Sequence, residues 1–398
     1  VAACAALARG RRSGAQRRAA VARSVRTSGK GVPLANCSCH GGAHLSADEK
    51  AFLDKIVAAM VVEGKGLTAC DEGPATIGAR LEPVGVENSE ETRRQYRQML
   101  FETPGINEYL SAAILDPETI LQKNDAGVFF PEALTKLGIM PGVKPHLKVY
   151  ELPGTGGETV MQGLDSLAAR CKEYKAGGAV FAKWRSPLMI TETAPSDFVI
   201  EANMKDLARV ALICQAEGLV PIVEPDIVMT GDHTLETAVA VNIKVQSVLY
   251  KAMLDHGVYM EGTILKTNMV NPGKSCPTSY TVEEIAKANI TVLRRCMPVA
   301  IPGVNFLSGG QNLEDASARL SHMNKVKGNS PWNLSFSWSA ALQMPLFQLC
   351  KGKDGKMPLD EMGAMYLAEL KIASAAAKGQ HEPKEGEGSH KGKKMAAA

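Results

Sequence analysis

Residues 179–188 read AVFAKWRSPL, residues 219–228 read LVPIVEPDIV, and the stretch between them, 196–217, has the apolar spacing of an amphipathic helix. Each of the two outer runs has the length and the composition of a single β-strand. Strands joined by a helical connection of this length pair in parallel, because a tight hairpin joins only antiparallel strands. The stretch therefore predicts one β-α-β unit of a parallel sheet.

The same alternation continues in both directions along the chain. Six further strands are expected at residues 66–71, 109–116, 142–152, 259–270, 304–310 and 332–338. Helices are expected at residues 46–62, 158–178, 233–256, 281–297, 312–325 and 358–378. The first helix opens with Ser46 and Glu49 at the spacing of a capping box. Eight strands that alternate with helices predict a (β/α)8 TIM barrel, a closed parallel sheet, over residues 45–378.

The competing architecture is an open, doubly wound sheet that binds a nucleotide. Its usual GxGxxG signature does not follow the first expected strand, and residues 154–157, GTGG, do not complete it. Residues 272–275, PGKS, resemble the end of a phosphate-binding P-loop. The position that the P-loop requires for its first glycine is Asn268, however, so this motif is rejected. The closed barrel is therefore the preferred fold.

The charges of the 398-residue chain are unevenly distributed. Residues 1–47 contain seven arginines and one lysine with no acid; since the whole chain carries +3 and this segment +8, the remainder carries −5. The basic segment, residues 1–44, has the composition of an organelle transit peptide, for a chloroplast in preference to a mitochondrion. A disordered basic tail that binds an anion is the alternative. The final residues, 379–398, are expected to form a flexible tail.

Several classes of partner are not expected. The acidic body argues against nucleic-acid binding, which needs clustered cations on the folded part. No run approaches the roughly 18 apolar residues that cross a bilayer. The nine cysteines form no CxxC pair and the eight histidines no HExxH motif. Cys37, Cys39 and His40 have no second pair of ligands, so neither a metal nor another cofactor is expected.

Ionisable side chains lie in the expected strands or at their ends, namely Asp71, Lys144, Lys183, Arg185, Glu224, Asp226 and Lys266. A barrel interior is otherwise apolar, and catalysis takes place at the carboxyl ends of its strands. Two lysines beside carboxylates fit imine chemistry, because a buried lysine next to a second cation has a lowered pKa and a reactive amine. Ser308, Gly309 and Gly310, just before a helix, offer backbone N–H groups to a phosphate.

At these residues the chain resembles the class I fructose-bisphosphate aldolases, from about Leu45 to Ala377. The similarity lies in the stretches GKGLTACDE, GAVFAKWR, VPIVEPDI, YMEGTILKTNMV, GVNFLSGGQ and FSWSAALQ. The resemblance implies a TIM barrel, usually a homotetramer, that acts on sugar phosphates. The implied reaction is the reversible cleavage of fructose 1,6-bisphosphate to dihydroxyacetone phosphate and glyceraldehyde 3-phosphate.

The resemblance also implies roles for individual residues. Lys266 is the expected Schiff-base nucleophile, Glu224 the general acid, Asp71 the carboxylate that handles the C4 hydroxyl, and Lys183 an aid to proton transfer. Asp226, the second acid of the VEPDI stretch, is also an expected catalytic residue. The expected phosphate-binding residues are Arg80, Lys144 and Arg185 for the distal phosphate, and Ser308, Gly309, Gly310 and Ser337 near the ketone.

The sequence departs from the family pattern at the phosphate sites. Ser339 and Ala340 replace a Gly-Arg pair, which removes the arginine that holds the C1 phosphate, and the closing C-terminal tyrosine is missing. The first loop lacks a hydroxyl, Ala79 replaces a lysine, and Asp226 replaces a glutamate. Lys351 or Lys353 is a possible substitute cation. Two alternatives therefore stay open: a Schiff-base aldolase for another or singly phosphorylated sugar, and a non-catalytic aldolase-like subunit.

Overall fold

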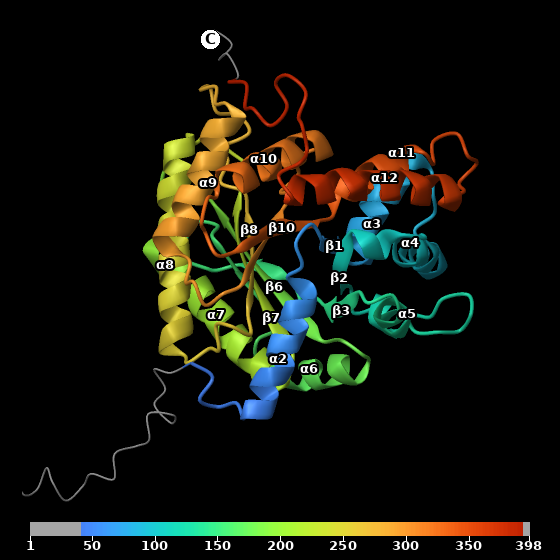
Figure 1. Ribbon diagram of the computed structural model, residues 1–398, viewed down its shortest axis with the longest axis horizontal. Helices are drawn as coiled ribbons and strands as arrows, with labels where there is room; N and C mark the ends of the chain where they lie inside the picture. The colour runs from blue at the N-terminus through green and yellow to red at the C-terminus, as the bar shows by residue number, and fades with distance from the viewer. Residues whose placement is uncertain (1–40, 393–398) are drawn as a thin grey trace, which may run out of the picture.

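The computed structural model describes residues 41–392, in which eight parallel strands close into a barrel (Figure 1). Around the barrel, the strands follow the order β1 (Gly66–Cys70), β10 (Asn333–Trp338), β9 (Gly303–Leu307), β8 (Ile264–Asn268), β7 (Val220–Val228), β6 (Phe181–Met189), β3 (Met140–Val143) and β2 (Leu110–Leu115). The TIM barrel predicted from the alternation of strands and helices is confirmed. The expected transit peptide lies almost wholly outside the described residues.

Helices alternate with the strands along the chain, and all of them except α2 cover the outside of the barrel. They are α2 (Ala47–Met60), α3 (Pro74–Leu81), α4 (Glu90–Glu102), α5 (Phe130–Lys136), α6 (Leu167–Ala176), α7 (Asp197–Ala216), α8 (Leu235–Asp255), α9 (Val282–Cys296), α10 (Leu313–Val326), α11 (Ala340–Gln348) and α12 (Leu359–Ala377). In Figure 1, α7, α8 and α9 lie along one side, and α10 and α12 lie above β10. No helix within residues 41–392 is long and apolar enough to cross a membrane.

Helix α2 closes one end of the barrel. The capping box expected at Ser46 and Glu49 is present and fixes the start of this helix. The buried face of α2, formed by Leu53, Ile56, Val57 and Met60, packs in one cluster with strand residues that include Leu67, Ala112, Phe181, Val220 and Ile264. These strand residues lie at or near the amino ends of their strands. The barrel is therefore filled at that end, and its polar groups gather at the carboxyl ends.

The third strand is shorter than predicted. The run expected at 142–152 contributes only its first residues to β3, because Pro145 has no N–H to continue the ladder. Residues Val149–Glu151 instead form β4, which pairs antiparallel with β5 (Thr159–Met161). Gly154, Gly156 and Gly157 have positive φ angles in the turn between them. The helix expected from residue 158 consequently begins only at Leu167.

The segment after α12, which was expected to be a flexible tail, is described by the structure as far as residue 392. Over residues 379–392 it lies against the barrel helices: Ser321 Oγ donates to the His381 carbonyl at 2.7 Å, and Arg319 Nε donates to the Gly388 carbonyl at 2.7 Å. Tyr280 and His390 exchange backbone hydrogen bonds of 2.9 and 2.8 Å. The segment thus forms part of the surface near the start of α10.

Candidate active site

A cavity of about 320 Å³ opens at the carboxyl ends of the barrel strands. Most of the residues expected at the site line this cavity: Asp71, Arg80, Lys183, Arg185, Glu224, Asp226, Lys266, Ser308, Gly309, Gly310 and Ser337. Lys144 is the exception, since it does not line the cavity. The barrel thus brings together side chains that are spread over more than 260 residues of the sequence.

Three adjacent strands position the charged centre of the cavity. Lys183 on β6 places its Nζ 2.7 Å from Asp71 Oδ2 and 3.0 Å from Glu224 Oε2. Lys266 on β8 lies on the other side of Glu224, with 3.8 Å between its Nζ and Oε1. Lys183, Glu224 and Lys266 are nearly fully buried, with 4% of each side chain exposed. Glu224 therefore lies between two lysines and within proton-transfer range of the Lys266 amine, directly or through one water.

The two lysines have different proton affinities. Burial lowers the pKa of Lys266, and the Lys183 ammonium lowers it further, although Glu224 opposes both effects. Burial acts in the same direction on Lys183, but the two carboxylates in contact with it raise its pKa above the ordinary value. The lysines, Lys183 first, hold the pKa of Asp71 well below its ordinary value despite burial. Of the two lysines, Lys266 therefore loses its proton more easily and supplies the neutral amine.

Asp226 is placed differently from the other acids. Its Oδ2 accepts a hydrogen bond of 2.7 Å from Arg185 Nε and forms an ion pair with Arg185 Nη2 at 2.6 Å. Burial raises the pKa of Asp226, and the charge of Arg185 opposes that shift. The contact fixes the guanidinium at the rim of the cavity, where 37% of the Arg185 side chain remains exposed. The geometry gives Asp226 the task of orienting Arg185.

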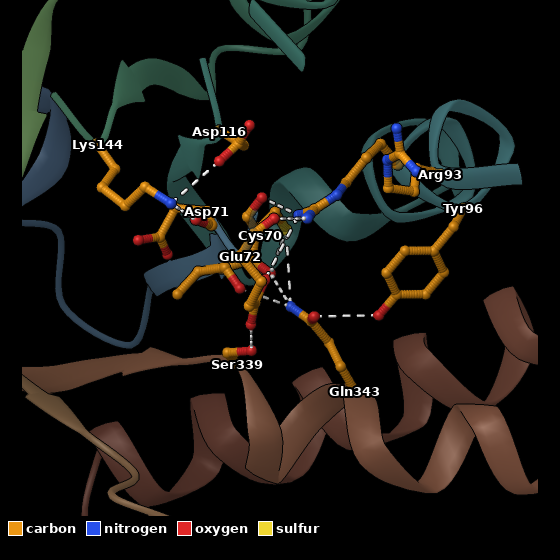
Figure 2. A network of polar contacts seen from close by, with 12 residues as sticks. Cys70, Asp71, Glu72, Arg93, Tyr96, Asp116, Lys144, Ser339 and Gln343 are labelled. Atoms are coloured by element: carbon orange, nitrogen blue, oxygen red, sulfur yellow. Dashed lines mark hydrogen bonds and ion pairs between the residues drawn. The ribbon is translucent and has the colours of Figure 1, made fainter. Parts of the chain in front are cut away.

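Lys144 lies behind Asp71, where it contacts two groups (Figure 2). Its Nζ is 3.0 Å from Asp116 Oδ2 and donates to the backbone carbonyl of Asp71. Asp116 was missed by the sequence reasoning, although it follows β2 in the same way that Asp71 follows β1. The ammonium of Lys144 therefore positions the chain at Asp71 and is not free in the cavity.

The replacement of glycine by Ser339 creates a second polar cluster at the cavity wall (Figure 2). Ser339 Oγ donates to Glu72 Oε1, and Arg80 Nη2 lies 2.9 Å from the same carboxylate oxygen. Both terminal nitrogens of Arg80 also donate to Ser339 Oγ at 3.2 Å. Glu72 was not expected as a site residue; its position next to Asp71 was the available signal. Arg80 is consequently held by this cluster.

The loop after β9 has the shape of an anion cradle. Gly309 and Gly310 have φ angles of 57° and 79°, and the Gln311 amide donates to the Ser308 carbonyl at 3.0 Å. Successive backbone N–H groups in such a turn point toward one concavity. Ser337, on the neighbouring β10, is 1% exposed and its Oγ has no partner among the described residues. The cradle and this hydroxyl line the same cavity.

No group of three metal-binding side chains of the His, Cys, Asp and Glu types lies close together within residues 41–392. Cys37, Cys39 and His40 fall outside that range. The barrel and its cavity define a class of protein: an enzyme scaffold equipped for imine chemistry on an anionic carbonyl compound.

Comparisons with known proteins narrow this class to one family. Residues 52–398 match the family described as "Glycolytic: Fructose-bisphosphate aldolase class-I". The chain is 45% identical to fructose-bisphosphate aldolase C of Homo sapiens, over 86% of this chain and 94% of that protein. It is 46% identical to the muscle-type aldolase of Lethenteron camtschaticum, over 85% and 93%. A solved structure of the Plasmodium falciparum aldolase, in complex with TRAP and an inhibitor, superposes with a TM-score of 0.82 at 40% identity, covering 85% of this chain and 98% of that one. The chain belongs to the class I fructose-bisphosphate aldolase family.

Proposed function

We propose that this protein reversibly cleaves fructose 1,6-bisphosphate through a Schiff base on Lys266. The observation that carries the proposal is the buried Lys266 amine, with its lowered pKa, opposite the Lys183–Glu224 pair. Membership of the family supplies the substrate and the products, which are dihydroxyacetone phosphate and glyceraldehyde 3-phosphate. No metal is needed to polarise the carbonyl in this chemistry, because the iminium itself attracts the electrons.

The reaction begins when the neutral Lys266 amine attacks the C2 carbonyl of the open-chain sugar. Glu224 then protonates the departing hydroxyl of the carbinolamine, which leaves as water and gives the iminium. Glu224 is in place for this step because its Oε1 lies 3.8 Å from the Lys266 nitrogen. The nearby Lys183 ammonium, 3.0 Å from Glu224 Oε2, limits the build-up of negative charge on this acid.

The carbon–carbon bond breaks when a base removes the proton of the C4 hydroxyl. We assign this role to Asp71, whose carboxylate lines the cavity and stays ionised beside Lys183. The electron pair of the C3–C4 bond moves toward the iminium nitrogen, which forms an enamine and releases glyceraldehyde 3-phosphate. Protonation of the enamine and hydrolysis of the imine then release dihydroxyacetone phosphate and restore Lys266.

A turnover assay separates this function from its alternatives. Purified protein is supplied with fructose 1,6-bisphosphate, sedoheptulose 1,7-bisphosphate and fructose 1-phosphate, and triose release is measured. Preferred cleavage of a bisphosphate supports the proposal. A larger kcat/KM for the monophosphate would favour an aldolase for singly phosphorylated sugars, an outcome that Ala340 in the cavity wall makes worth testing. No turnover of any of them, with the Lys266→Met variant equally inactive, would indicate a non-catalytic subunit.

The basic leader supports a proposal about location. We assign residues 1–44 to a plastid transit peptide, which would place the enzyme in the stroma and its reaction in the Calvin cycle. A fluorescent protein fused to residues 1–44 should enter plastids, and the fusion to residues 45–398 should not. Accumulation in mitochondria would reassign the leader. The family resemblance also leads us to propose a homotetramer, which light scattering on purified protein tests directly.

A further inference from the structure

We propose that Lys274 is the cation that binds the substrate phosphate held by Ser308, Gly309 and Gly310. The inference rests on the proposed function, and it assigns a specificity-determining role to a residue in the loop after β8. This loop contains the PGKS stretch, residues 272–275, that fails as a P-loop in the sequence. The structure brings its lysine to a phosphate cradle on a different segment of the chain.

The position of Lys274 is the first observation. Its Nζ lies only 3.2 Å from the point that a Cβ atom would occupy on Gly310. The ammonium therefore lies directly beside Gly310, one of the glycines of the cradle. A side chain at position 310 would occupy this space, so glycine at this position leaves room for both the lysine and its ligand.

The main chain around Lys274 is firmly held. Its amide donates to the Met229 carbonyl at 2.8 Å, and the flanking Gly273 and Ser275 amides donate to the carbonyls of His233 and Gly231 at 2.8 and 2.9 Å. Gly273 allows this close approach, because a Cβ there would come within 2.4 Å of the Gly231 carbonyl oxygen. The backbone of Lys274 is thus fixed, while its long side chain can adjust its position to the ligand.

The charge of Lys274 is available for binding. Within residues 41–392, no carboxylate lies within 4.0 Å of its ammonium, the distance that defines an ion pair. A second cavity, of about 350 Å³, adjoins the first and shares Gly310 and Gln311 with it; Lys274 and Arg319 also line it. Arg319 is buried and donates to Gln311 Oε1 at 2.6 Å, which holds the end of the cradle in place. The acid in this lining, Asp315, accepts a hydrogen bond from the Gly388 amide at 2.8 Å.

Three other cations, Arg80, Lys351 and Lys353, do not bind at the cradle. Ala340 has replaced the arginine that the family pattern places on this wall, and Arg80 is bound to Glu72 and Ser339. Lys353 pairs with Glu361 at 3.1 Å, and neither Lys353 nor Lys351 lines either of the two cavities, whereas Lys274 lines the second. The unpartnered hydroxyl of Ser337, in the same cavity, is a separate sign that a polar ligand group belongs here. Lys274, beside the cradle, is the cation that we assign to the substrate phosphate.

The test compares two ligands that differ only in the phosphate. Borohydride traps the imine that each forms with the enzyme, and the adduct is measured by intact mass across a concentration series of dihydroxyacetone phosphate or of dihydroxyacetone. The Lys274→Met variant should need about tenfold or more dihydroxyacetone phosphate for half-maximal trapping, as expected for the loss of a hydrogen bond between charged groups. Its dihydroxyacetone curve should shift less than about twofold.

Two further variants serve as controls. Lys274→Arg should retain most of the affinity for dihydroxyacetone phosphate, and Lys351→Met should behave like the parent protein. Unchanged curves for Lys274→Met, or equal shifts for both ligands, would overturn the assignment of Lys274 while leaving the Schiff-base function intact. A parent protein that forms no adduct with either ligand would overturn the function itself and, with it, this inference.

Discussion

Replacement of Lys183 by methionine tests the charged centre of the site most severely. The substitution keeps most of the side-chain length but removes the ammonium that lies 2.7 Å from Asp71 and 3.0 Å from Glu224. Because this side chain is 4% exposed, water cannot replace the lost charge. Removing one partner of a buried ion pair costs about 3–5 kcal/mol, and we expect the free energy of unfolding at pH 7 to fall by about this amount.

The pH dependence distinguishes this explanation from a simple packing defect. In the parent protein, the lowered pKa of Asp71 contributes stability above the ordinary carboxyl pKa, and that contribution is lost as pH falls through the folded pKa. In Lys183→Met, the two carboxylates lose the ammonium that lies between them and repel each other, so protonation of one of them stabilises the fold. The difference in stability between parent and variant should therefore shrink as pH falls from 7 to 5.

Chemical denaturation at several pH values between 5 and 8 measures both the loss in the free energy of unfolding and its dependence on pH. Lys205→Met is the matched control, since Lys205 pairs with Glu201 at 2.7 Å on an exposed helix face and should cost about 0.5 kcal/mol or less. A stability loss for Lys183→Met that is the same at pH 5 and pH 7 would refute the reasoning, because a cavity without charge has no pH dependence.

Three further outcomes follow from the same geometry. Glu224→Gln should lower kcat by about 10²–10⁴-fold with a smaller effect on trapping of dihydroxyacetone phosphate, because the amide cannot transfer a proton; a parent-like kcat in steady-state assays would move the acid–base role elsewhere. Ala340→Arg should raise the affinity for dihydroxyacetone phosphate about tenfold or more in the Lys274→Met variant. It should change the parent protein little, because Lys274 already binds the phosphate there. Equal effects of Ala340→Arg in the two trapping series would contradict this. Burial raises the pKa of Glu369 to about 8, with a contribution from Glu314, so the parent loses stability as pH rises from 5 to 8. Over that range the stability of Glu369→Gln relative to the parent should grow by about 3 kcal/mol, and parallel denaturation curves would count against the shifted pKa.

The sequence predicted the barrel because its signals are local. Strand length, helix spacing and the Ser46 capping box each depend on neighbouring residues, and the structure agrees with them. The third strand was predicted too long because residues 146–152, HLKVYEL, continue with the alternation of a strand past Pro145, where the ladder ends. The pairing of β4 with β5 depends on a glycine turn that the strand pattern does not reveal.

The residues of the candidate site also fall into those that could be predicted from local sequence and those that depend on contacts between distant segments. Residues at the strand ends, such as Lys266 and Glu224, could be predicted, because the barrel places all such positions at one rim. The contact of Lys144 with Asp116 depends on the adjacency of β2 and β3, and it removes from the cavity a lysine that had been expected to bind phosphate. Lys274 was missed because its neighbour Gly310 lies on another segment of the chain, and the sequence spacing of the two residues carries no signal.

The identity of the trapped lysine tests the central claim most directly. The protein is incubated with dihydroxyacetone phosphate and borohydride, digested, and the modified peptide is sequenced by mass spectrometry. A single adduct on Lys266, absent from the Lys266→Met variant, is the predicted result. An adduct on Lys183, or no covalent adduct under conditions in which the enzyme cleaves its substrate, would contradict the assignment of Lys266 as the Schiff-base nucleophile.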